Sequence, residues 1–104
     1  FSGCSSLSDI SIPSSVTSIG KGAFKECVLL QSLTIPFHVT CIGELTFFGC
    51  TSLIRISFPS SLISIGKKAF KGCKLLAHLT IPSSVKEIAN DAFAGCSLLK
   101  HNFY

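Results

Sequence analysis

The chain has 104 residues, of which 47% are hydrophobic and 13% charged, and its formal net charge is +4. A composition this apolar requires a large buried core. Ser, Thr, Gly, Pro or Lys interrupts the apolar residues every few positions, so no run reaches the roughly 18 residues of a membrane span. The nine Lys and Arg residues are scattered and lack interleaved aromatics, which argues against nucleic acid as a partner.

Residues of one type recur along the chain at a step of 23. The clearest series are Phe1, Phe24, Phe47, Phe70 and Phe93; Cys4, Cys27, Cys50, Cys73 and Cys96; and Pro13, Pro36, Pro59 and Pro82. A fixed period in the twenties predicts a stacked repeat architecture, in which neighbouring repeats of the same chain bury one another. We expect one array over residues 1–104, of about four and a half 23-residue units. Because Phe1 stands where a start methionine is expected, we interpret the chain as a fragment of a longer array.

Each unit predicts the same four elements, and the first unit illustrates them. Residues 7–12 alternate apolar and polar side chains, which is the period of a strand. Pro13 lacks an N–H for a sheet ladder and marks the place where the chain turns away. A second short strand is expected over residues 16–19. After Gly20, apolar residues at spacings of one, three and four predict a short helical turn that ends at Cys27.

Two positions of the repeat leave alternatives open. Gly20, Gly43 and Gly66 indicate either a backbone with positive φ or close packing, and Ala89 at the same position makes packing at least as strong an explanation. Asn102 occupies the inward position that Leu79 holds one unit earlier, so residues 102–104 either begin a cap or mark the end of the array.

The pattern LxxIxIPxxVxxIGxxAFxxC, present as LLAHLTIPSSVKEIANDAFAGC from Leu75 to Cys96, resembles the BspA-like class of leucine-rich repeats. The resemblance implies a leucine-rich-repeat solenoid that is right-handed, with short parallel strands along one face and short second strands and helical turns on the others. Family members are mostly surface or secreted proteins of bacteria and protists involved in adhesion. The family has no catalytic motif. In the second copy, Phe37 and Phe48 are expected to add exposed aromatic surface.

The cysteines allow more than one interpretation. Five of them recur at one position, where their Cα atoms should lie about 5 Å apart, within the range that allows a disulfide. Each lies between inward Phe and Leu residues, however, so we interpret the column as buried free thiols that pack as small hydrophobic side chains. Cys41 is aligned with Ser18, Ser64 and Glu87, and we predict it to be the exposed, reactive thiol.

No catalytic, metal or cofactor site is predicted. The repeat assembles no phosphate loop, carboxylate pair or serine-base-acid set, which favours a protein that is not an enzyme. His78 and His101 are expected side by side on neighbouring strands, but zinc requires three or four protein ligands, so we interpret them as exposed polar residues. The lysines at 21, 25, 67, 68, 71 and 74 gather on the segment opposite the strands, as a solvated face or a surface for acidic partners or lipid head groups.

We predict the partner-binding surface on the outward side of the first strands, where residues of successive units form two columns. They are Asp9, Ser32, Arg55 and His78 in one, and Ser11, Thr34, Ser57 and Thr80 in the other. The hypothesis is a non-enzymatic protein-protein interaction or adhesion module, on the cell surface or secreted, with a protein or a host or matrix surface as partner. The alternative is a structural repeat component of a larger intracellular assembly, cytoplasmic or cytoskeletal.

Overall fold

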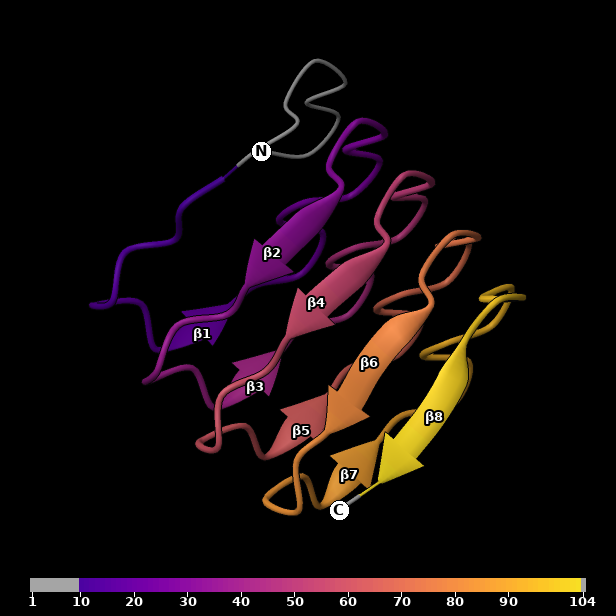
Figure 1. Cartoon of the computed structure of the whole chain (residues 1–104). Helices are drawn as coiled ribbons and strands as arrows, with labels where there is room; N and C mark the ends of the chain where they lie inside the picture. The colour runs from indigo at the N-terminus through magenta and orange to yellow at the C-terminus, as the bar shows by residue number, and fades with distance from the viewer. Residues whose placement is uncertain (1–9, 104) are drawn as a thin grey trace.

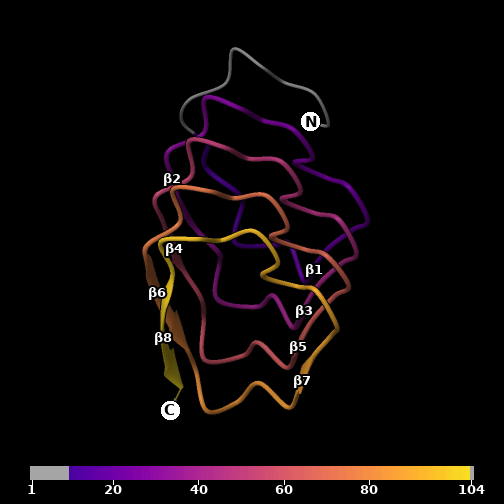
Figure 2. The same ribbon diagram turned by 90° about the vertical axis from the view of Figure 1, so that its right-hand side faces the viewer.

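In the computed structural model, which describes residues 10–103, the chain forms eight short strands in two parallel sheets. One sheet contains β1 (Ser18–Ile19), β3 (Cys41–Ile42), β5 (Ser64–Ile65) and β7 (Glu87–Ile88). The other contains β2 (Ser32–Thr34), β4 (Arg55–Ser57), β6 (His78–Ile81) and β8 (Lys100–Phe103). Each turn of the chain, which we call a coil, adds one strand to each sheet (Figure 1). The coils stack with the two sheets along different sides, so the predicted solenoid is confirmed (Figure 2).

The first unit departs from the predicted strand lengths. Residues 10–12 form no strand, and the rest of the strand expected over 7–12 lies outside the described residues. The second strand is two residues long, Ser18–Ile19, where four were expected. The turn at the proline position is confirmed, because the N–H of Val39 donates to the carbonyl of Pro36 at 3.2 Å, and the same bond recurs at the other prolines.

Residues 23 apart pair across both sheets. Ser32 lies opposite Arg55 and Leu33 opposite Ile56, and Arg55 lies opposite His78. The last strand differs, since β8 pairs His78 with Lys100, and Asn102 with Thr80. The expectation that His101 lies beside His78 and Asn102 beside Leu79 is therefore wrong. A shift of one residue exchanges the two faces of a strand, and this register gives Phe103 the position opposite the inward Ile81.

The core is a set of columns in which equivalent residues of successive coils stack on one another. The rings of Phe24 and Phe47 lie 5.4 Å apart at 8°, those of Phe47 and Phe70 5.0 Å apart at 10°, and those of Phe70 and Phe93 5.2 Å apart at 5°. The phenylalanines at 24, 47, 70 and 93, which recur at the 23-residue step, therefore form one continuous stack that is buried except at Phe93, which is half-buried. Around it lie buried aliphatic side chains of both sheets and of the turns, which include Leu30, Leu33, Val39, Ile42, Leu53, Ile56, Leu62, Ile65, Leu76 and Leu79.

The helical turns predicted after each Gly position are wrong, because residues 10–103 contain no helix. We call these stretches, at 20–27, 43–50, 66–73 and 89–96, the turn segments. In the first, the N–H groups of Gly22 and Phe24 donate to carbonyls of the next coil at 2.9 and 2.8 Å. Those of Ala23 and Lys25 instead close local turns onto the third residue before them. Alternate N–H groups therefore bind the neighbouring coil, and a helix would have consumed them internally.

Positive φ occurs at two positions of the turn segment. Neither is the position of Gly20, Gly43 and Gly66, where the sequence suggested it. The first position holds Gly22, Leu45, Lys68 and Asp91, and the second holds Glu26, Gly49, Gly72 and Gly95. Residues other than glycine rarely adopt this conformation, which interrupts the helical run. The glycines at 49, 72 and 95 recur at the 23-residue step and were the signal available in the sequence.

Gly43 and Gly66 serve close packing, the other alternative considered. A Cβ on Gly66 would lie 2.6 Å from the carbonyl carbon of Gly43, and one on Gly43 would lie 2.9 Å from that of Gly20. These are backbone atoms of the neighbouring coil, which cannot move aside as a flexible side chain can. The N–H of Gly66 donates to the carbonyl of Ile42 at 2.7 Å, and the equivalent bond from the N–H of Ala89 to the carbonyl of Ile65 is longer, at 3.0 Å.

Phe70→Ala should lower the free energy of unfolding by about 3–5 kcal/mol, because it empties the middle of the aromatic stack. Urea denaturation monitored by circular dichroism measures the change. Phe37→Ala is the control, since Phe37 is 70% exposed and its loss should change stability by less than about 0.5 kcal/mol. Equal stability of the Phe70 variant and the parent chain would contradict the stacked core.

Gly66→Ala should cost roughly 1–3 kcal/mol of stability, because the new methyl group overlaps the backbone of the preceding coil. Gly20→Ala provides a matched control in the same chain, since nothing within residues 10–103 lies within 4 Å of a Cβ there and no positive φ is involved. Thermal melts of the two variants are compared directly. If both variants melt at the same temperature, close approach of the coils is not what requires glycine.

Candidate partner-binding site

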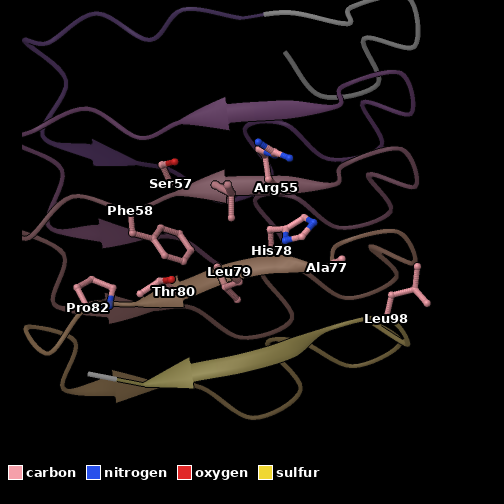
Figure 3. Close-up of a pocket in the computed structure, with 10 residues that line it drawn as sticks. Arg55, Ser57, Phe58, Ala77, His78, Leu79, Thr80, Pro82 and Leu98 are labelled. Atoms are coloured by element: carbon pink, nitrogen blue, oxygen red, sulfur yellow. The ribbon is translucent and has the colours of Figure 1, made fainter.

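The outward side of β2, β4, β6 and β8, which we call the strand face, carries the residues predicted to bind a partner. Arg55 and His78 lie side by side on adjacent strands (Figure 3), and Ser32 and Thr34 pair with Arg55 and Ser57. All are exposed, whereas the residue between each outward pair is buried. Thr80 and Ser11 are exposed as well, although Ser11 precedes the first described strand. Asp9 lies outside the described residues.

Two hollows mark the strand face. The larger, of about 790 Å³, is lined by Arg55, Ser57, His78 and Thr80 together with Phe58, Pro82 and Leu98 among others (Figure 3). The smaller, of about 430 Å³, is lined by residues that include Ser11, Ser32, Thr34, Arg55 and Ser57. Arg55 and Ser57 belong to both hollows. The seven described residues of the predicted site therefore all line one hollowed face.

Phe58 and Leu98 are lining residues that the sequence analysis did not include in the site. Phe58 stands where Ile35 and Ile81 are buried, and its larger ring stays half-buried, edge-on to Phe70 at 5.9 Å and 71°. Leu98 is 53% exposed on the turn before β8. The replacement of an inward Ile by Phe was the visible signal for Phe58, and for Leu98 it was the recurrence of Leu at 29, 75 and 98.

The polar groups of the strand face are not used by the fold. Within residues 10–103, none of the seven side chains takes part in a hydrogen bond or ion pair. Thr46 behaves differently: it is buried, and its hydroxyl donates to the carbonyls of Gly43 and Gly20 at 2.7 and 3.0 Å. Polar residues that stabilise the coils are thus distinct from those that face outward.

The turn segments carry the lysines at 21, 25, 67, 68 and 71, and the charge of Lys21 is partly compensated. Lys21 lies 4.0 Å from the carboxylate of Glu44, with both side chains largely exposed, so this contact contributes little to stability. The ammonium of Lys25 lies 5.6 Å from the centre of the Phe48 ring. Phe48 is half-buried and adds less exposed aromatic surface than expected, whereas Phe37 is exposed and stacks on His38.

The column of cysteines is confirmed as buried free thiols for Cys27, Cys50 and Cys73, whereas Cys96 is half-buried and Cys4 lies outside the described residues. Beyond packing, the thiols link the coils. Those of Cys50, Cys73 and Cys96 each donate to the carbonyl of a phenylalanine in the preceding coil at 3.1 Å. Cys41 is half-buried, so the expectation of full exposure is only partly met.

Burial and a hydrogen bond between neighbouring thiols set the acidity of these cysteines. It raises the pKa of Cys50 to about 12, since the thiolate would lie in an apolar core. The hydrogen bond with Cys96 and then burial raise the pKa of Cys73 above its ordinary value. The same hydrogen bond lowers the pKa of the half-buried Cys96, because the Cys73 thiol stabilises its thiolate. Cys96 therefore loses its proton before Cys73.

Other sites considered from the sequence find no support in the structure. His78 pairs with Lys100, not with His101, so the two histidines do not form a shared column. Across residues 10–103, no group of three or more His, Cys, Asp or Glu side chains comes together as a metal site. In the same part of the chain, no helix is long and apolar enough to cross a membrane.

Comparison with known proteins defines the class. A family described as BspA type leucine-rich repeat region (6 copies) matches residues 1–104. A leucine-rich repeat protein from Bacteroides ovatus is 43% identical to this chain, with a TM-score of 0.93. The match covers 100% of this chain and 27% of the Bacteroides ovatus chain. A leucine-rich cell surface protein from Faecalibacterium prausnitzii is 37% identical with a TM-score of 0.82, covering 86% and 24%. A leucine-rich repeat protein from Bacteroides capillosus is 36% identical with a TM-score of 0.78, covering 86% and 64%.

The fold and these matches define a leucine-rich-repeat protein, a class whose members generally mediate protein-protein interaction and are typically not enzymes. The chain belongs to the BspA-type leucine-rich repeat family. It spans about a quarter of the first two solved structures that it matches. No curated protein matches it.

A maleimide reagent should label Cys41 and Cys96 in the native chain, while Cys27, Cys50 and Cys73 should react only on unfolding. The reagent needs an accessible thiolate, which burial denies to the latter three. Mass spectrometry of timed samples at pH 8 locates the modified residues. A Cys41→Ser variant controls for the assignment, and labelling of Cys50 as fast as that of Cys41 would contradict the buried column.

Proposed function

We propose that the chain is a recognition module that binds a protein partner on its strand face. The observation that carries the proposal is that the seven described residues of the two columns line one hollowed face and have no hydrogen bond or ion pair in the described part of the chain. A binding surface needs such side chains, since groups already bound within the fold are not available to a partner. Small hydroxyl residues in one column also let a partner approach the backbone closely.

We further propose that the module works at a cell surface or as a secreted protein, in adhesion or ligand capture. The support is the match to a protein from Faecalibacterium prausnitzii that is described as a cell surface protein, at 37% identity. The family resemblance points in the same direction. Binding through a rigid array suits adhesion, because the core columns hold the outward residues at constant spacing and little order has to be gained on binding.

Arg55→Ala combined with His78→Ala should weaken partner binding at least tenfold, about 1.4 kcal/mol, without changing the thermal melt. The test is selection from a library of displayed random peptides on the immobilised chain, followed by affinity measurement of the recovered peptides. A second variant reverses the charge of Lys67, Lys68 and Lys71 on the turn segment and should bind the same peptides unchanged. Loss of binding in the lysine variant alone would place the interface on the turn segments and contradict the proposal.

A further inference from the structure

We infer that the strand face recognises an acidic, partly apolar peptide segment, with a side-chain carboxylate of the partner held by Arg55 beside His78. The inference rests on the proposed function and adds the chemistry of the partner to it. Its three supports are the charge of the face, the apolar ends of the larger hollow, and the length of the face across the strands.

The centre of the face is cationic and has no counter-charge in the described residues. Arg55 is flanked on the neighbouring strands by Ser32 and His78. Among residues 10–103, no Asp or Glu lines either hollow. The ion pair found within residues 10–103 is that of Lys21 with Glu44, on the turn segments. The guanidinium therefore presents its fork of N–H donors outward, a geometry that matches a carboxylate.

Apolar side chains lie on either side of this charged centre. Phe58 and Pro82 line one end of the larger hollow, and Leu98 lines it on the side of the turn before β8 (Figure 3). A partner that buries a hydrophobic side chain against Phe58 or Leu98 gains free energy that a purely ionic ligand does not. A polyphosphate would instead favour an array of cations, whereas Arg55 is shared by both hollows and no lysine of residues 10–103 lines either of them. An acidic peptide with apolar neighbours therefore fits better than a nucleic acid.

The size of the face sets the length of the segment. From Thr34 to Thr80 the site crosses two strand steps, β2 to β4 and β4 to β6, of about 4.8 Å each, or roughly 10 Å, which three residues of an extended chain span. Arg55 and Ser57 are shared by both hollows and lie near the middle of this path. An acidic residue in the centre of the segment would meet Arg55, with an apolar residue next to it over the larger hollow.

The test uses two peptides with blocked ends, one of alternating Glu and Leu and one of alternating Gln and Leu. Fluorescence anisotropy measures their affinity for the 104-residue chain. The acidic peptide should bind at least tenfold more tightly than its amide counterpart. Arg55→Gln should remove that preference, whereas Lys67→Gln, the same charge change on a turn segment, should leave it intact.

Several outcomes overturn the inference. Equal affinity for the two peptides, or no binding of either, shows that carboxylates are not recognised. An equal loss in the Lys67 variant shows only general charge attraction. Tighter binding of a 12-nucleotide single-stranded DNA that depends on Arg55 assigns the face to nucleic acid. If displayed peptides without acidic residues bind and depend on the strand face, the proposed function stands and this inference alone fails.

Discussion

The backbone hydrogen bonds between successive coils are the constraint on which the rest of the structure depends. A coil of 23 residues with strands of two to four residues and no helix satisfies few of its own N–H and carbonyl groups. Its neighbours satisfy them, in both sheets and along the turn segments, where alternate N–H groups reach the next coil. Because buried backbone groups must be paired, successive coils stack with equivalent positions of the repeat over one another.

That register explains the repeated chemistry of the interior. Phenylalanine rings stack at 5.0 to 5.4 Å because each stands in the same place on its coil. Gly43 and Gly66 recur where a Cβ would meet the backbone of the preceding coil. The cysteines recur where a small side chain with a weak donor reaches the carbonyl of a phenylalanine one coil earlier. Each of these residue types fits the distance between successive coils at its position.

The side chains that hold the coils together point inward, so the outward side chains of the strand face remain available to bind a partner. The residue between two outward positions of a strand is buried and aliphatic, while the outward residues have no hydrogen bond within the described part of the chain. Changes in Arg55 or His78 should therefore alter recognition without unfolding the array. Phe58 belongs both to the core and to the strand face, since its ring contacts Phe70 of the core and also lines the larger hollow.

The sequence by itself determined the period, the solenoid, the inward columns and the outward columns, because a 23-residue repeat places equivalent residues over one another whatever the details of the coil. It also distinguished Cys41 from the cysteine column.

Tertiary structure alone decided three features. The turn segments are not helical, because their N–H groups bind the next coil, and local spacing carries no information about that competition. Strand β8 pairs with β6 one residue away from the register of the 23-residue repeat, because the alternation of residues along a strand does not by itself fix which residues of two strands lie opposite one another. Phe58 and Leu98 join the binding face because a hollow is formed by residues from several coils, and its shape exists only after they stack.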